Sequence, residues 1–294
     1  MDKSTAVAVE ELSWPREITD AEFALFQALV QKETGIQLPE VKRSLLVGRL
    51  ARRVRELRLR TFGEYYRRVT VDGDTAERMN LFDRIATNET HFFREPRHFE
   101  YLERQILPAW LAQAEARRRR VRVWSAACST GEEPYSLAMT LLAALKGWQI
   151  DILASDLSTH ALRRAESAMW PIDKAHEIPE RHLKAFMLKG TGAYAAFMKA
   201  GPELRELVRF RRVNLHDDHT AAEGPFDLVF CRNVLIYFSP EGRARVVEKL
   251  SNSLAPDGYL FIGHAETLSG INSRLRTVEP TVYAFPSSLN GYSS

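Results

Sequence analysis

Short apolar segments alternate with helical patterns from residue 121 to residue 285. Strands that are joined through helices run parallel in one sheet, with helices packed on its faces. The alternation therefore predicts a doubly wound α/β sheet. The predicted strands are residues 121–127, 149–155, 207–214, 226–233, 258–264 and 281–285, and the predicted helices are residues 134–147, 159–169 and 240–255.

Residues 170–206 interrupt this alternation. The segment contains three prolines and is too long for a simple connection between a strand and a helix. Gly190, Thr191 and Gly192 lie near its middle and are typical of a tight turn. We therefore expect an inserted subdomain that carries a small hairpin.

Residues 18–94 have helical patterns throughout. Thr19 and Asp20 provide an N-cap for a helix that ends near Gly35. Further helical stretches follow, and together they predict a small helical bundle. A bridging helix over residues 98–120, interrupted by Pro108, leads from the bundle to the first strand.

One helix of the bundle concentrates positive charge. Residues 41–60 contain eight basic residues and one acid, so this segment carries +7 while the other 274 residues carry −4. Leu46, Leu50 and Val54 recur at helical spacing, which places arginines on the opposite face. Such a face could be merely solvated, or it could bind an acidic partner, either a nucleic acid or an acidic protein helix.

Three predicted strands end in polar residues, at the edge where open α/β sheets bind ligands. Glu132 and Glu133 follow the first strand, and their charge favours an ammonium or sulfonium group over a phosphate. Asp156 ends the second strand and suits ribose hydroxyls, although aspartate is also a common N-cap. The third of these polar ends belongs to the predicted strand 226–233, which leads into Arg232 and Asn233. This end lacks the Asn/Asp-Pro-Pro-aromatic motif of nucleic-acid amino-methyltransferases.

Residues 87–95 surround Phe92 and Phe93 with hydrogen-bonding side chains and Arg94. They could form a helix end with core aromatics, or a lid over a ligand. The histidines form no group with metal-ligand spacing, so we expect no metal.

Composition narrows the class of protein. The chain is 45% hydrophobic and 27% charged, which is ordinary for a globular protein. Its longest uncharged apolar stretch, residues 136–145, is too short to cross a bilayer. Cys128 and Cys231 both lie in apolar segments, which favours a reduced cytoplasmic protein over a disulfide framework.

These segments together resemble the chemotaxis receptor glutamate methyltransferases, the CheR family. The resemblance rests on TNETHFFRE, RVWSAACSTGEEPYSLAM, LASD and FDLVFCRNVLIYF in this order, with APDGYLFIGHAE and TVYA towards the end. It implies the class I fold of S-adenosylmethionine-dependent methyltransferases, with a small antiparallel β-subdomain insertion and an all-α N-terminal domain. The expected divisions are residues 15–90 for the helical domain, 91–120 for the linker and bridging helix, and 121–286 for the methyltransferase domain, with the insertion at 170–206.

The resemblance also implies roles for individual residues. Glu133, with Glu132 as the alternative, would bind the methionine amino group, and Asp156 would bind the ribose. Arg94 and Tyr237 would lie near the methyl group as catalytic residues. Arg94 would also be a cofactor contact, and the further cofactor contacts would be Asn88, Thr90, Asn214, Leu215, Arg232 and Asn233. The docking residues would be Arg49, Arg52, Arg53, Arg55 and Arg58, and Gly190, Thr191 and Gly192 would belong to a loop that binds a receptor peptide.

The activity that the resemblance implies is methylation of glutamate side chains on membrane chemoreceptors. S-adenosyl-L-methionine would be the donor, and the products would be glutamate methyl esters and S-adenosyl-L-homocysteine. The partner would be the glutamate-rich coiled coil of the receptor, and in part of the family also a peptide at the receptor's C-terminus. We expect a cytoplasmic monomer that is recruited to receptor arrays. The alternatives are a nucleic-acid methyltransferase and a cofactor-loaded binding module without turnover.

Overall fold

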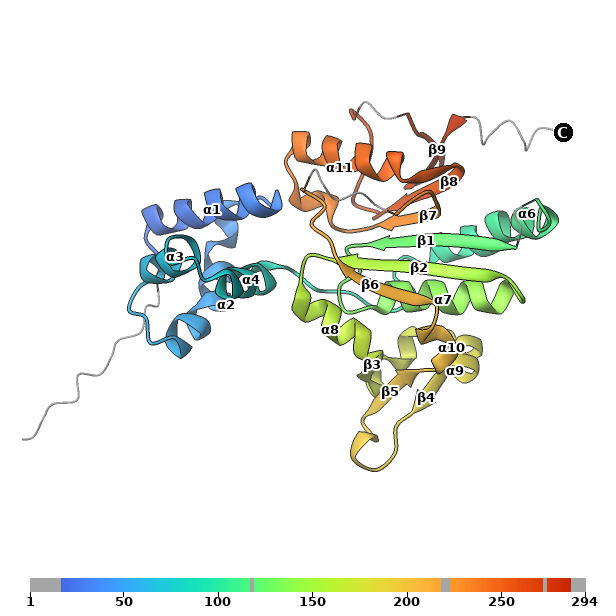
Figure 1. Ribbon diagram of the computed structural model, residues 1–294, viewed down its shortest axis with the longest axis horizontal. Coiled ribbons are helices and arrows are strands. Elements are labelled where there is room, and N and C mark those ends of the chain that lie inside the picture. The colour runs from blue at the N-terminus through green and yellow to red at the C-terminus, as the bar shows by residue number, and fades with distance from the viewer. Residues whose placement is uncertain (1–16, 117–118, 218–222, 272–273, 287–294) are drawn as a thin grey trace, which may run out of the picture. The chain divides into compact units, whose positions relative to one another are not determined.

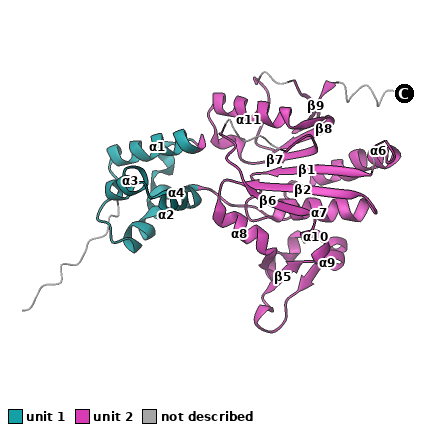
Figure 2. Cartoon of the chain, viewed as in Figure 1, with its two compact units in different colours: residues 1–33, 37–85 teal, residues 34–36, 86–294 magenta. Residues whose placement is uncertain are grey.

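The computed structural model describes residues 17–116, 119–217, 223–271 and 274–286 (Figure 1). The chain forms two compact units (Figure 2). Residues 1–33 and 37–85 belong to the first unit, and residues 34–36 and 86–294 belong to the second. The structure thus divides the chain at residue 85, a few residues before the expected boundary, and residues 15 and 16 of the expected helical domain lie outside the described residues.

The first unit is built from helices, as the helical patterns predict. Its elements are α1 (Asp20–Thr34), η1 (Glu40–Lys42), α2 (Arg43–Glu56), α3 (Phe62–Thr70) and α4 (Thr75–Ile85). The predicted apolar stripe of Leu46, Leu50 and Val54 is buried. However, α2 is shorter than the basic segment 41–60 and ends at Glu56, because Arg58 takes a left-handed φ of 58°.

The second unit contains a seven-stranded sheet in the order β6-β2-β1-β7-β8-β10-β9. Its strands are β1 (Arg120–Ala126), β2 (Gln149–Asp156), β6 (Val208–Arg212), β7 (Phe226–Cys231), β8 (Leu254–Ile262), β9 (Arg276–Glu279) and β10 (Val282–Ala284). The first five strands in this order are parallel, whereas β10 is antiparallel to both β8 and β9. The expected fold class is confirmed, and the sheet is mixed because its last two strands form a hairpin.

Helices cover both faces of this sheet, and alternate strand residues point to opposite cores. In β1, Val123 packs into the core with α7 (Glu132–Ala144), and Trp124 packs into the core with α11 (Pro240–Asn252). The bridging helix consists of α5 (Pro96–Tyr101), a π-helical turn η2 (Leu102–Ile106) and α6 (Leu107–Ala112). The irregular turn ends two residues before Pro108, which has no backbone N–H to continue a regular ladder of helical hydrogen bonds.

The insertion follows α8 (Thr159–Ser167) and contains a small antiparallel sheet, visible at the bottom of Figure 1. Its strands are β3 (Met169–Pro171), β4 (Met187–Lys189) and β5 (Phe197–Ala200), in the order β3-β5-β4. Its helical elements are η3 (Ile172–Glu177), α9 (Glu180–Phe186), η4 (Gly192–Tyr194) and α10 (Pro202–Arg205). Within the described residues, no helix combines the length and the apolar character that crossing a bilayer requires.

Candidate active site

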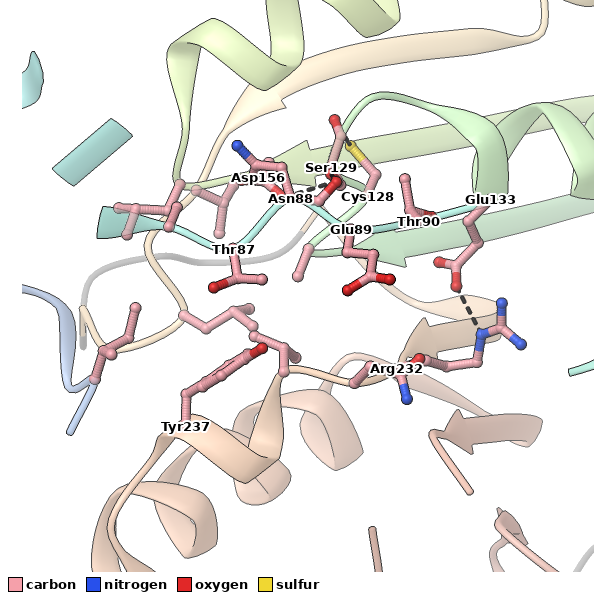
Figure 3. Close-up of a pocket in the computed structure, with 18 of the residues that line it drawn as sticks. Thr87, Asn88, Glu89, Thr90, Cys128, Ser129, Glu133, Asp156, Arg232 and Tyr237 are labelled. Carbon is pink, nitrogen blue, oxygen red and sulfur yellow. Dashed lines mark hydrogen bonds and ion pairs between the residues drawn. The ribbon is translucent and has the colours of Figure 1, made fainter. Parts of the chain in front are cut away.

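A cavity lies in the second unit where β1, β2 and β7 end (Figure 3). It encloses about 890 Å³, open solvent included. Side chains that follow neighbouring parallel strands gather at one edge of the sheet, so this position is the expected one for a ligand. The structure brings to this cavity all ten residues that the resemblance assigns to cofactor and catalysis, namely Asn88, Thr90, Arg94, Glu133, Asp156, Asn214, Leu215, Arg232, Asn233 and Tyr237.

The turn between β1 and α7 takes an irregular path beside the cavity. Ala127, Ser129 and Gly131 have left-handed φ values of 63°, 50° and 96°. A Cβ on Gly131 would lie 2.9 Å from the Cβ of Ala165, so the turn requires glycine at this point. This path directs the Ser129 amide to Asp156, 2.8 Å from Oδ2. Local strain of this kind persists where a site needs a particular backbone shape.

Asp156 is buried at the end of β2 and is held by backbone amides. Oδ2 accepts from Ser129, and Oδ1 accepts from the amide of Ser158 at 2.8 Å. The N-cap of α8 is Ser158, whose hydroxyl accepts from the amide of Ala161. Each carboxylate oxygen has more than one lone pair, so Asp156 can also accept bonds from ligand hydroxyls.

Glu133 forms a buried ion pair with Arg232, drawn as a dashed line in Figure 3. Arg232 Nε lies 2.7 Å from Oε2, and the hydroxyl of Ser125 donates to Oε1 at 2.6 Å. Arg232 also donates to the carbonyl of Arg94 at 2.5 Å. The guanidinium therefore fixes both the carboxylate and the segment that carries Arg94.

Glu132, the alternative to Glu133, has other partners. Its carboxylate is 1% exposed, lies 2.7 Å from Lys174 Nζ and accepts from the Thr130 hydroxyl at 2.6 Å. The same Lys174 ammonium donates to the carbonyl of Thr90 at 3.0 Å. Glu133 lines the cavity and Glu132 does not, so the geometry favours Glu133 as the ligand contact.

Residues 87–95 contain both buried core aromatic residues and polar residues that line the cavity. Phe92 and Phe93 are buried in the core, and their amides donate to Glu177 and Ser136 at 2.8 and 3.0 Å. Arg94 lines the cavity, and its guanidinium donates to the carbonyl of Glu89 at 3.1 Å. The aromatic core residues thus anchor a segment whose polar side chains contact the cavity.

The remaining wall of the cavity comes from the ends of β6 and β7. The Asn214 side chain is bonded within its own turn, to the amide of His216 and to Asp217, so an aromatic ligand would contact its backbone or Leu215. Tyr237 ends η5 (Leu235–Tyr237), and Figure 3 shows its ring directed into the cavity. The apolar residues of this wall include Val213, Leu215, Val234 and Phe238, and Leu157, directly after β2, also lines the cavity.

Several cavity residues were not identified from the sequence. Thr34 and Ile36 line the cavity, and Ile36 forms a β-bridge with Phe238. The sequence marks this place only as a helix end at Gly35. Glu95 does not line the cavity, but its carboxylate accepts from the Asn233 side-chain amide at 3.2 Å. Nothing in the local pattern distinguishes Thr34 and Ile36 from other residues at a helix end.

A cluster of Glu95, His98 and His264 has ligand atoms within 4.8 Å of one another. However, Arg232 Nη1 lies 3.2 Å from His98 Nδ1 and 3.5 Å from Glu95 Oε2. Burial, and next the charge of Arg232, lower the pKa of His98 to about 3. The guanidinium already supplies the positive charge here and would repel a metal cation.

The predicted docking arginines belong to the first unit and differ in their contacts. Arg53 donates to the buried Glu77 at 2.5 and 2.9 Å, and Arg49 donates to the carbonyl of Ile85. Arg49 and Arg53 therefore make contacts within the bundle, and docking by the five arginines stays a prediction. Of these five, Arg52, Arg55 and Arg58 have exposed side chains.

The predicted peptide loop lies between β4 and β5 of the insertion. Gly190 to Gly192 do not line the cavity. Two large apolar side chains beside the loop are exposed, Leu188 at 54% and Tyr194 at 61%. The loop is thus an accessible surface of the small sheet.

Three kinds of ligand-binding group of the protein lie together in the cavity. Glu133 can bind a cationic group, Asp156 can accept from hydroxyls, and the apolar wall can contact a flat ring. The residues present therefore fit a ligand that combines an ammonium, a ribose and a base.

Comparison with known proteins agrees with this geometry. Residues 88–284 match the family model described as CheR methyltransferase, SAM binding domain, and residues 21–86 match CheR methyltransferase, all-alpha domain. Chemotaxis protein methyltransferase 2 of Pseudomonas aeruginosa is 39% identical over 269 residues, which cover 90% of this chain and 93% of that protein. Chemotaxis protein methyltransferase of Salmonella typhimurium is 36% identical over 271 residues, which cover 91% of each.

Proposed function

This chain belongs to the CheR methyltransferase family, and we propose that it methylates glutamate side chains of chemoreceptors. It is an S-adenosylmethionine-dependent methyltransferase of chemotaxis. The observation that supports the finer proposal is the cavity, which is lined by all ten residues to which the resemblance gives a cofactor or catalytic role. The products would be glutamate 5-O-methyl esters and S-adenosyl-L-homocysteine.

The cavity residues fit the donor. When bound, S-adenosylmethionine supplies an electrophilic methyl group on a positively charged sulfur. Asp156 would hold the ribose hydroxyls, and Glu133 would hold the amino group in an orientation fixed by Arg232 and Ser125. Asn214 and Leu215 would contact the adenine. Asn88, Thr90 and Asn233, which also line the cavity, would complete the contacts.

Catalysis requires little acid–base chemistry. A glutamate carboxyl group has a pKa of about 4.3, so the substrate is already a nucleophile at neutral pH. Arg94 and Tyr237 would align this carboxylate without acting as nucleophiles. Alignment, together with removal of water, contributes several kcal/mol to such a transfer.

Partner recognition would use other surfaces. The exposed Arg52, Arg55 and Arg58 would attract the glutamate-rich coiled coil of a receptor. The loop at Gly190–Gly192 would bind a C-terminal receptor peptide where the receptor has one. We further propose that the protein works as a cytoplasmic monomer recruited to receptor arrays.

The test uses donor with a radiolabelled methyl group, receptor-containing membranes and purified protein. After mild base treatment, a carboxyl methyl ester releases volatile labelled methanol, which we expect. Base-stable label in RNA or DNA would contradict the proposal in favour of a nucleic-acid methyltransferase. Absence of any label, with the donor bound, would contradict it in favour of a binding module without turnover.

A further inference from the structure

A further buried carboxylate, that of Glu266, contacts residues of the cavity wall without lining the cavity itself. Glu266 is 6% exposed and follows the end of β8. Its Oε2 accepts from the amides of Gly263 and Asn233 at 2.6 and 3.0 Å, and its Oε1 accepts from the amide of Ile236 at 3.3 Å. No ion pair is recorded for this carboxylate among the described residues.

This environment is costly for a charged group. Burial raises the pKa of Glu266, although its hydrogen bonds to backbone amides act in the opposite direction. Buried carboxylates usually have a cationic partner, as Glu133 has in Arg232. A neutral side chain at this position would avoid the free-energy cost of burying a charge. A carboxylate is therefore expected only if the surrounding amides need an anionic acceptor.

The backbone explains why these amides need an acceptor. After β7 the chain turns sharply, and Asn233 has a left-handed φ of 58°. The turn removes the amides of Asn233 and Ile236 from the strand ladder and directs them at Glu266. Gly263 approaches so closely that a Cβ there would lie 2.5 Å from Asn233 Nδ2 and 2.8 Å from its backbone nitrogen.

We propose that Glu266 is a positioning residue, which fixes the turn 233–237 and thereby directs Asn233 and Tyr237 into the cavity. Both side chains line the cavity, and Tyr237 follows directly after the bonded amide of Ile236. Glu266 itself does not line the cavity, so it acts only through these neighbours. The catalytic part of this inference rests on the proposed function, whereas the structural part does not.

The test is the substitution Glu266→Gln in the full chain. Glutamine preserves size but places an NH₂ group where an acceptor is needed. Amide hydrogen exchange of residues 233–237 should become about tenfold faster, because two hydrogen bonds are weakened. The Kd for S-adenosyl-L-homocysteine should rise by no more than about threefold, because Asn233 is one of several cofactor contacts, while kcat for methyl transfer should fall about tenfold, since alignment depends on the turn.

Glu248→Gln, on the exposed face of α11, is the matched control and should leave every value unchanged. Unchanged exchange at 233–237 in Glu266→Gln would overturn the proposal, as would equally faster exchange across β8 and α11. If Glu266→Gln does not fold, Glu266→Asp is used instead, because it keeps the charge. Faster amide exchange only at residues 233–237 in this variant supports the proposal, and unchanged exchange there overturns it. If wild-type protein transfers no methyl group, the proposed function fails, but the exchange measurement still decides the role of Glu266.

Discussion

At the scale of single residues, the buried acids of the cavity differ in what stabilises their charge. Glu133 has the guanidinium of Arg232, whereas Asp156 has two backbone amides. Glu132, next to Glu133, has Lys174. The consequences of removing each charge should therefore differ, although the residues are chemically alike.

Glu133→Gln should weaken binding of S-adenosyl-L-homocysteine at least about tenfold, because it removes the anion that faces the cavity and breaks the buried ion pair with Arg232. Glu132→Gln should mainly lower the free energy of unfolding, because the Lys174 bridge lies outside the cavity. Calorimetric titration and urea unfolding of both variants check this. A larger loss of binding in Glu132→Gln would reverse the assignment.

Tyr237→Phe should lower the rate of methyl transfer while the cofactor still binds, because the ring remains and only the hydroxyl is lost. Asp156→Ala should instead abolish most binding, because it removes an acceptor for ribose and the partner of the Ser129 amide. Titration with S-adenosyl-L-homocysteine and initial rates on receptor membranes separate the two effects. Equal loss of binding in both variants would contradict the division of roles.

At the scale of elements, α2 combines structural and exposed arginines. Arg53 pairs with Glu77, a carboxylate that is 3% exposed and also accepts from the Tyr65 hydroxyl at 2.8 Å. Burial alone would raise the pKa of Glu77, but the bonds from Arg53 and Tyr65 outweigh burial and lower it. Arg55 is exposed on the same helix. The resemblance implies docking for both arginines, but their environments differ, because Arg53 is paired with a buried carboxylate and Arg55 is exposed.

Arg55→Glu should reduce receptor methylation about tenfold at low salt, with unchanged stability and cofactor binding, because it reverses an exposed charge that attracts an acidic partner. The difference from wild type should shrink as salt is added. Arg53→Glu should destabilise the first unit by about 3–5 kcal/mol, because it places two carboxylates together in a buried site. Urea unfolding and methylation assays test the pair, and similar stability of both variants would contradict this prediction.

The inserted subdomain also contacts the segments that form the cavity. Trp170 in β3 donates to the carbonyl of Thr130 at 3.2 Å, and Lys174 in η3 bridges Thr90 and Glu132. Glu177, also in η3, accepts from the amide of Phe92. The first part of the insertion therefore stabilises two segments that line the cavity, and its later part carries the exposed loop.

At the scale of the whole molecule, buried histidine should make stability depend on pH. The pKa of His98 falls to about 3, because burial and then Arg232 disfavour its charged form, whereas an unfolded histidine titrates near pH 6.5. Between these values the unfolded chain binds a proton that the folded protein does not. Stability therefore falls as pH falls through this window, and His98 alone should account for about 2 kcal/mol between pH 7 and pH 5.

Urea unfolding of wild type and His98→Gln at both pH values measures this contribution. The loss of unfolding free energy on acidification should be about 2 kcal/mol smaller in the variant. His160→Gln, at an exposed position of α8, is the control and should behave as wild type does. An unchanged loss in His98→Gln would mean that other groups determine the acid sensitivity.

Local pattern in the sequence was sufficient for every strand of the main sheet except β9, for the inserted subdomain and for the polar strand ends. Apolar periodicity reports which residues face a core, and turn residues report where the chain reverses, so these features need no knowledge of distant partners. It could not show that β10 runs antiparallel to β8, because strand direction depends on which strands pair.

The sequence by itself determined that Asp156, Glu133 and Arg232 would meet at one edge of a sheet, since parallel strands bring their carboxyl ends together. Only the tertiary structure decided that Glu133 rather than Glu132 faces the cavity, that Arg53 stabilises the bundle, and that Glu266 bonds the turn at Asn233. In each case the deciding partner is distant in sequence. Identical side chains acquire different roles from the charge and burial around them, and these arise only when the chain is folded.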